Sequence, residues 1–369
     1  MIALAVVAGI LLVLVPLWDT YETILLPRRL PNDFRISRVL LRSLWNAWRV
    51  IARRVGHRPY REIFLSFYPQ LSLIALFVVW ALGIILGFSL LHWANGSWVR
   101  GEAHMSGYPA DLYLSGSTFF TLGLGDVVPA TGLARFMTVV EAGLGFGFLA
   151  LLISYVPVLY QSFSPREARI TMLDEWAGSP PTAGQILKRA FESRDPGAHL
   201  DRLLHGWESG AATILESHLS YPLLAFFRSQ HDNQSWLASL CAVLDAAAVV
   251  SAGVEGIDPF QARLTFAIGR HTLVDVSQVF RLKPVRDGVE RSGPERLGEL
   301  HRWLVAQGVP VDTRPEAVQR FEELRRLYGP YVAGLSEYLM MPLPALIPPE
   351  RGRFNWQTTS STQRIDGAH

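Results

Sequence analysis

The sequence predicts an all-α integral membrane protein, and three observations support this fold class. Half of the 369 residues are apolar and 18% are charged, and the mean hydropathy of +0.21 is high for a soluble protein. Three apolar segments reach or approach the roughly 20 residues that a membrane helix needs. The rest of the chain reads as helices separated by breaks such as RDPG and GIDP.

The three apolar segments are Ile2 to Trp18, Phe64 to Trp93 and Leu133 to Tyr160. The first has no positively charged start, and no small-residue cleavage site precedes Trp18. We therefore interpret residues 1–26 as an N-terminal membrane helix. A secretory signal is the alternative.

The arginines predict how the chain is oriented in the membrane. The loop after the first segment, residues 27–62, holds ten arginines, and cytoplasmic loops are rich in such residues. The next loop carries only Arg100 as a fixed cation before Asp126, which predicts an outer loop. In this multi-pass protein of the cell membrane the N-terminus is expected outside, and everything after Tyr160 is expected in the cytoplasm.

The basic loop also predicts an amphipathic helix. FRISRVLLRSLWNAWRVIARRV interleaves arginines with apolar residues at helical spacing. Such a helix can lie on the inner leaflet or pack on the protein's own cytoplasmic domain, and both interpretations stay open. From Arg166 onward the chain has 22 basic and 24 acidic residues, a net charge of −2, so nucleic acid is not an expected partner.

Between the second and third segments lies STFFTLGLGDVVP, residues 117–129, after a short amphipathic stretch, Asp111 to Phe120. Irregular backbone at membrane depth must be buried in protein or line a water-filled cavity. Gly123 and Gly125 can adopt positive φ, so that successive carbonyl groups point the same way. A column of carbonyl oxygens can replace the hydration shell of a cation.

These residues resemble the pore-loop potassium channel family, whose chains place a pore helix and a T-V-G-Y-G-D filter between two membrane helices. The resemblance covers Phe64 to about Phe163 and describes a two-transmembrane, pore-loop bacterial ion channel with an extra N-terminal membrane helix. It implies a pore domain at residues 63–163 with its pore loop at 111–129. It also implies roles for six filter residues, and the only metal expected is potassium at the filter carbonyls. Thr121, Leu122, Gly123 and Leu124 would bind the ion, Gly125 would let the strand turn outward, and Asp126 would lie at the outer mouth.

Leu124 stands where the family usually has the aromatic residue of G-Y-G. The second pore loop of two-pore-domain potassium channels is similar, since it often reads G-L-G. Without the aromatic hydroxyl, we expect Tyr113, Phe119 and Phe120 to hold the filter by packing more than by hydrogen bonds.

The third segment is expected to be the inner, pore-lining helix. Gly145 lies at the distance beyond the filter at which related channels have a hinge glycine, while close helix packing is the alternative for the glycines here. Pro157 should kink the helix. Gly145 and Pro157 are thus gating candidates. Glu141, a carboxyl group inside the apolar span, is a candidate support of the filter.

One pore loop per chain cannot form a pore, so the resemblance implies a homotetramer. Residues 164–347 are expected to form a helical cytoplasmic domain, and residues 348–369 a disordered tail. The apolar segment beginning at Trp236 is short for a membrane span and carries Asp245, which favours a buried core helix. No nucleotide-binding, metal-binding or nucleophile motif is found, so no cofactor and no enzymatic activity are expected.

The sequence therefore predicts a passive, potassium-selective channel, gated by an inner helix that is coupled to the cytoplasmic domain. It does not identify the regulatory ligand or protein. The alternative is a non-conducting membrane receptor or scaffold whose helical domain binds a protein partner. The intact filter from Thr121 to Asp126 favours the channel, since a non-conducting protein has no reason to keep it.

Overall fold

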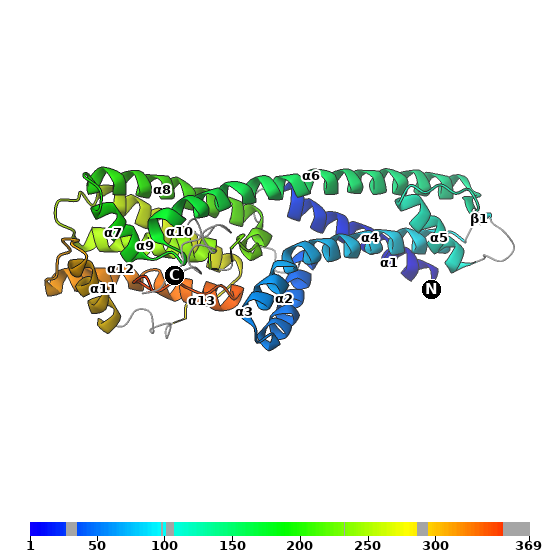
Figure 1. The fold of residues 1–369 in the computed structure, drawn as a ribbon. Coiled ribbons are helices and arrows are strands. Elements are labelled where there is room, and N and C mark those ends of the chain that lie inside the picture. Colours follow the sequence, from blue (N-terminus) through cyan, green and yellow to red (C-terminus); the bar gives the residue numbers. More distant parts are fainter. Residues whose placement is uncertain (27–34, 97–98, 101–106, 232, 286–293, 350–369) are drawn as a thin grey trace, which may run out of the picture. The chain divides into compact units, whose positions relative to one another are not determined.

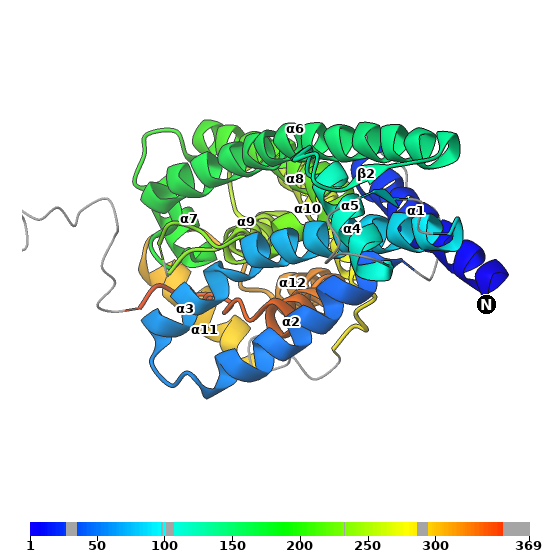
Figure 2. The same cartoon turned by 90° about the vertical axis from the view of Figure 1, so that its right-hand side faces the viewer.

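The computed structural model describes residues 1–26, 35–96, 99–100, 107–231, 233–285 and 294–349. The chain divides into two compact units, Met1–Tyr160 and Gln161–His369 (Figures 1 and 2). Apart from one two-stranded antiparallel sheet, the regular structure of the described residues is helical. The predicted all-α fold class is confirmed.

Four stretches of the described chain are long and apolar enough to cross a membrane. Three of them contain or extend the segments expected from the sequence, and the fourth is the apolar segment that begins at Trp236. The stretches are Ile2–Ile24, Arg58–Ala94, Gly132–Ala177 and Trp236–Gly253.

In the first unit, α1 (Ile2–Thr20) packs closely along α4 (Tyr68–Ala94), and both are seen in Figure 1. A Cβ added at Gly87 would lie 2.6 Å from Val13 Cγ2, and one added at Gly9 would lie 2.9 Å from the Gly87 carbonyl oxygen. The small residues thus let the two backbones approach, as is common between membrane helices.

The end of α1 is tied to its neighbours by the buried carboxyl group of Asp19, just before a π-helical turn, η1 (Tyr21–Leu25). Asp19 accepts hydrogen bonds from the Ser37 backbone N–H at 2.9 Å and from the Ser37 hydroxyl at 3.0 Å. It also accepts one from Trp80 Nε1 at 2.8 Å. Three donors compensate for the loss of hydration of this buried group.

Two helices, α2 (Ile36–Arg54) and α3 (Arg58–Ser66), precede α4, and Figure 2 shows both. The ring centroids of Trp45 and Tyr68 are 4.7 Å apart. The Tyr68 hydroxyl donates to the Leu41 carbonyl oxygen at 2.8 Å. The predicted amphipathic helix is therefore present, and one face of it packs against the beginning of α4.

The remaining elements of the first unit surround the predicted pore loop. They are β1 (Val99–Arg100), α5 (Tyr108–Phe119), β2 (Val128–Pro129) and α6 (Gly132–Ala177). The helix α6 continues beyond Tyr160, where the inner helix was expected to end, and so enters the second unit. Its later part buries a helical stripe of residues: Phe163, Arg166, Ile170, Leu173 and Ala177.

The second unit is built around α9 (Trp236–Gly253), in which every residue from Trp236 to Ala252 is buried. The helix begins after Ser235, whose hydroxyl accepts a hydrogen bond from the Ala238 N–H at 3.0 Å. Other helices of this unit cover α9 on all sides, as expected for a core helix.

A buried ion pair lies in this core. Arg325 Nε is 3.2 Å from Asp245 Oδ1, and the Tyr328 hydroxyl also donates to Asp245 Oδ1. Burial, together with the charge of Asp245, raises the pKa of Tyr328 well above its usual value. The hydroxyl therefore stays protonated and remains a donor to the carboxylate.

The helices α8 (Pro196–Ser220) and α10 (Phe260–Val279) pack against each other (Figure 1). The Thr272 hydroxyl of α10 donates to the Ala211 carbonyl oxygen of α8 at 3.0 Å. The unit is completed by α7 (Ala183–Phe191), the 3-10 turn η2 (Pro222–Phe226), α11 (Pro294–Ala306), α12 (Pro315–Arg326) and α13 (Gly329–Leu339).

Prolines limit two helices of this unit. The helix α8 stops at Ser220 because Pro222 lacks an N–H group and disfavours helix at the preceding residue. The helices α12 and α13 are separate elements, and Pro330 lies at the beginning of α13. Of the expected disordered tail, residues 350–369 lie outside the described residues.

Candidate functional site

The predicted filter joins the end of α5 to β2, and hydrogen bonds fix its beginning. The Thr121 N–H donates to the Thr118 carbonyl oxygen at 3.0 Å, and the Leu122 N–H donates to the Ser117 carbonyl oxygen at 2.7 Å. The carboxyl end of a helix carries partial negative charge, which favours a nearby cation. The first filter residues are thus held at the end of the pore helix.

The backbone of the filter alternates in its conformation. φ is +57° at Thr121, +59° at Gly123 and +80° at Gly125, whereas Leu122 and Leu124 are not among the residues with positive φ. Positive φ was expected for the two glycines. It was not expected for Thr121, because a β-branched residue is strained in this region. Strain of this kind is concentrated at functional sites.

Two contacts hold the outer end of the filter. The Tyr113 hydroxyl of α5 donates to Asp126 Oδ2 at 2.8 Å, and the other carboxyl oxygen of Asp126 accepts from the Val127 N–H at 3.1 Å. Just beyond, β2 pairs with β1 in antiparallel register, with Val99 opposite Pro129. The filter is therefore joined both to the pore helix and to the segment that follows α4. The sequence analysis expected packing more than hydrogen bonds here, and the structure adds the hydrogen bond of Tyr113.

The side chains of the filter region are exposed in the single chain. Phe120, Leu122 and Leu124 are 61%, 60% and 67% exposed. Exposed apolar side chains that lie together commonly mark a protein or membrane contact. One chain alone does not enclose this loop.

Glu141 of α6 lies behind the pore helix and is completely buried. One of its carboxyl oxygens is hydrogen-bonded to the hydroxyl of Ser115, in the middle of α5. That hydroxyl also donates to the Ile85 carbonyl oxygen of α4 at 2.8 Å. Ser115 and Glu141 thus connect the pore helix to both helices beside it.

His92 of α4 lies near the same carboxyl group. Its Nε2 is 3.9 Å from Glu141 Oε2, and its side chain is 1% exposed. Neither of these two atoms has a hydrogen-bond partner. The sequence analysis did not single out His92, although a histidine near the end of a membrane span is a visible signal.

Gly145 packs directly against the backbone of Phe119, the last residue of the pore helix α5. A Cβ added to Gly145 would lie 2.0 Å from the Phe119 carbonyl oxygen, a distance that no real side chain adopts. Gly143 and Gly147 have nothing within 4 Å of such a Cβ in this chain. Close packing is sufficient to explain a glycine at position 145. The hinge role stays a prediction, as does the role of Pro157, through which the helix continues.

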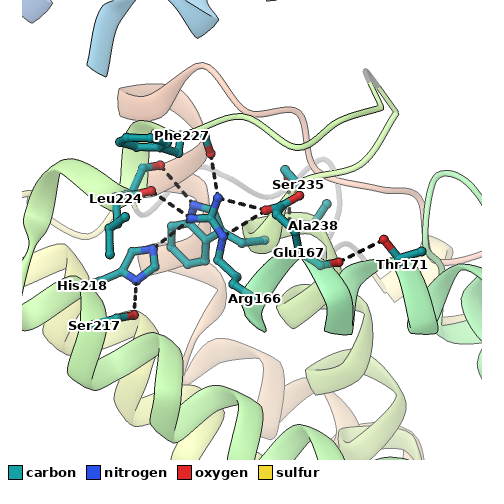
Figure 3. A network of polar contacts seen from close by, with 11 residues as sticks. Arg166, Glu167, Thr171, Ser217, His218, Leu224, Phe227, Ser235 and Ala238 are labelled. Carbon is teal, nitrogen blue, oxygen red and sulfur yellow. Dashed lines mark hydrogen bonds and ion pairs between the residues drawn. The ribbon is translucent and has the colours of Figure 1, made fainter. Parts of the chain in front are cut away.

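The second unit holds the later part of α6 through Arg166, which is buried (Figure 3). Its five N–H groups all have acceptors. The carbonyl oxygens of Leu224 and Phe227 accept at 2.8 and 2.9 Å. Glu167 Oε1 accepts from Nε and Nη2 at 3.1 and 3.0 Å. His218 Nε2 lies 3.4 Å from Nη1.

His218 must be neutral in this arrangement, because a guanidinium group can only donate hydrogen bonds and Nε2 therefore accepts. Burial, together with the charge of Arg166, lowers the pKa of His218 well below its usual value. The other ring nitrogen, Nδ1, is 3.1 Å from the Ser217 hydroxyl, as Figure 3 shows. The network thus fixes the later part of α6 to the segment between α8 and α9.

Within the described residues, no three histidine, cysteine, aspartate or glutamate side chains are grouped so that they could hold a metal ion.

Comparison with known proteins relates the same part of the chain to channels. Residues 74–161 match a family described as "Ion channel", and the matched region contains most of α4, all of α5, the filter and α6 as far as Gln161. The chain is also 31% identical, over 142 residues, to the uncharacterized membrane protein YdjJ of Bacillus subtilis (strain 168). That match covers 38% of this chain and 39% of the relative, so it spans less than half of either protein. No solved structure matches the chain.

Two membrane helices enclose a pore helix and a loop of alternating backbone conformation, and this same segment matches the channel family. Residues 74–161 are therefore similar to an ion-channel family, and they lie within a multi-pass membrane protein.

Proposed function

We propose that the protein is a potassium-selective channel, with the ion bound by the backbone carbonyl oxygens of Thr121, Leu122, Gly123 and Leu124. The observation that carries this proposal is the positive φ at residues 121, 123 and 125. In an extended segment, successive carbonyl groups point to opposite sides. Alternation with left-handed residues turns them to one side, where they can replace the water around a cation.

The proposed pore is a homotetramer. A single filter strand supplies carbonyl groups from one direction only, whereas a dehydrated cation needs ligands all around it. The exposed side chains of Leu122 and Leu124 support this assembly, since neighbouring copies would cover them. The membrane part of α6 also exposes a row of apolar side chains that neighbouring copies or lipid would cover: Phe136, Val139, Phe146, Ile153 and Tyr160.

Gating is proposed to depend on α6. The chain passes from the channel domain into the second unit within this one helix, which runs from Gly132 to Ala177. Gly145 and Pro157 lie in its membrane part, and Arg166 is bound to the second unit. A rearrangement around Arg166 would therefore act on the inner helix without a flexible linker to absorb it.

The proposed topology follows the arginine distribution, with the N-terminus outside and the domain at residues 164–347 in the cytoplasm. The amphipathic helix α2 would then lie at the inner leaflet. Its outward face keeps Val39, Val50 and Ile51 exposed beside arginines, which suits the interface between lipid and water.

The test is ion flux through purified protein reconstituted into liposomes. We expect potassium flux. In mixed potassium and sodium solutions, the reversal potential should lie near the equilibrium potential of potassium. Equal permeability to both ions would replace the proposal with a non-selective cation channel. A correctly assembled protein that carries no flux under any condition would favour the receptor or scaffold function.

A further inference from the structure

A cluster of buried polar side chains behind the pore helix has no part in ion coordination. Ser115 belongs to α5, Glu141 to α6 and His92 to α4, and each is at most 1% exposed. Burying polar and ionisable groups inside a membrane costs free energy, so such groups are candidates for a structural or functional role. The donors and acceptors within the cluster indicate which protonation state makes it stable.

The Ser115 hydroxyl has one hydrogen atom and two oxygen neighbours. The Ile85 carbonyl oxygen, at 2.8 Å, can only accept a hydrogen bond. If Ser115 donates there, its contact with Glu141 needs a hydrogen atom from the carboxyl group. A protonated Glu141 supplies that atom, and both contacts are then complete hydrogen bonds.

The position of His92 agrees with an uncharged pair. A buried carboxylate and an imidazolium would need direct hydrogen bonds to compensate for the loss of hydration. Here Nε2 and Oε2 are 3.9 Å apart, beyond hydrogen-bond distance, and neither has another partner. Among the described residues, no lysine or arginine forms an ion pair with Glu141. Asp111, one helical turn before Ser115 on α5, is a further buried carboxyl group and cannot supply positive charge.

We propose that Glu141 is a neutral acid that donates its proton to Ser115, and that it forms with His92 an uncharged clamp that positions the pore helix. His92 is a positioning residue in this clamp, because it acts on the filter only through Glu141 and α5. The link from the clamp to ion selectivity rests on the proposed channel function, whereas the protonation state does not.

The protonation state can be measured by infrared spectroscopy on the purified, reconstituted protein. A protonated carboxyl group has a carbonyl stretch that is separate from the bands of carboxylates and of the backbone. We expect the difference between the wild type and Glu141→Gln to contain this band, and Ser115→Ala to shift it. Glu62→Gln is the matched control, because Glu62 is buried on α3 outside the cluster. A carboxylate band in the difference spectrum would overturn the neutral acid. Since the measurement needs no conduction, it gives an answer even if the proposed function fails.

The clamp is tested by two pairs of variants in the flux assay. Gln at position 141 keeps the shape of the side chain and a donor toward Ser115, whereas Val removes both. We expect Glu141→Gln to retain the preference for potassium over sodium and Glu141→Val to reduce it about tenfold, the usual effect of a buried group that loses its partner.

For His92, we expect His92→Gln to retain the preference and His92→Leu to reduce it, with tetramer content measured in each variant. If His92→Leu behaves like the wild type in an assembled tetramer, His92 has no positioning role. If Glu141→Gln is as damaging as Glu141→Val, the charge of Glu141 is needed and the neutral clamp is wrong.

Discussion

The Tyr113 hydroxyl donates a hydrogen bond to Asp126 Oδ2 across 2.8 Å, joining the middle of the pore helix to the outer end of the filter. The two residues lie 13 positions apart in the chain, with the other five filter residues, Thr121 to Gly125, between them. The bond therefore closes the loop that contains the proposed ion-binding carbonyl groups. It is exposed in the single chain, so its strength depends on how well water is kept away.

Tyr113→Phe removes this bond and leaves the ring in place. We expect the filter to lose its conducting conformation more readily, seen as a faster decline of current at constant voltage, while the preference for potassium is retained. Loss of the bond is expected to shift the equilibrium toward the non-conducting conformation of the filter. Tyr60→Phe, on the exposed surface of α3, is the control. An unchanged decline of current in Tyr113→Phe would show that the bond does not hold the filter.

Gly123→Ala places a Cβ on a residue with a φ of +59°. Left-handed conformation costs an ordinary residue roughly 1–2 kcal/mol, and the cost applies to every copy in a tetramer. Nothing lies within 4 Å of the added atom in this chain, so backbone conformation and not a clash is tested. We expect little potassium flux from normally expressed protein. Gly143→Ala, within a helix and equally unobstructed, should conduct normally. Selective flux at the wild-type level from Gly123→Ala would rule out the assigned filter.

Gly145→Ala tests close packing, since its Cβ would lie 2.0 Å from the Phe119 carbonyl oxygen. The pore helix or α6 must move to admit it. We therefore expect a lower melting temperature and loss of flux, with Gly147→Ala as the control on the same helix. A Gly145→Ala protein of normal stability whose open probability alone has changed would instead support a hinge at this position.

Arg166→Met removes the cation and leaves the Leu224 and Phe227 carbonyl oxygens without this donor. If the second unit controls the inner helix through Arg166, open probability should change in single-channel recordings while ion selectivity stays the same. Arg169→Met is the matched control, because the hydrogen bonds of Arg169 to Thr213 and Ser209 are longer, at 3.3 and 3.5 Å. Equal open probability in the wild type and Arg166→Met would argue that this unit serves assembly or partner binding.

His218 predicts how the stability of the second unit depends on pH. Burial and Arg166 lower the pKa of His218 in the folded protein, whereas an unfolded histidine takes up a proton near pH 6.5. The unfolded state therefore binds more protons below this pH. The contribution to stability is complete above it and is lost as the pH falls, by at most about 1.4 kcal/mol per pH unit.

We expect the stability of wild-type protein to fall more steeply below pH 6.5 than that of His218→Gln, measured by chemical unfolding. Other histidines contribute to both proteins, so the difference between the two curves isolates His218. Parallel curves would mean that His218 has the same pKa in the folded and unfolded states.

Much of the fold could be predicted from the sequence because it depends on local properties. An apolar stretch as long as the one in α4 must be a membrane helix, since only a helix satisfies its own backbone in lipid. Glycines at positions 123 and 125 predicted positive φ because a residue without a Cβ adopts it at little cost. The sequence also indicated that α9 is a buried core helix, because it is short for a membrane span and carries Asp245.

What the tertiary structure alone decided is which distant side chains meet. No local pattern indicates that Ser115 lies against Glu141, or that Arg166 reaches the carbonyl groups of Leu224 and Phe227, because these pairs are 26, 58 and 61 positions apart. The same holds for Thr121, whose own residue type disfavours the conformation that the two ends of the loop impose on it. Composition and steric preference determine the helices and the glycine positions, whereas the path of the whole chain determines the partners that hold the filter in place.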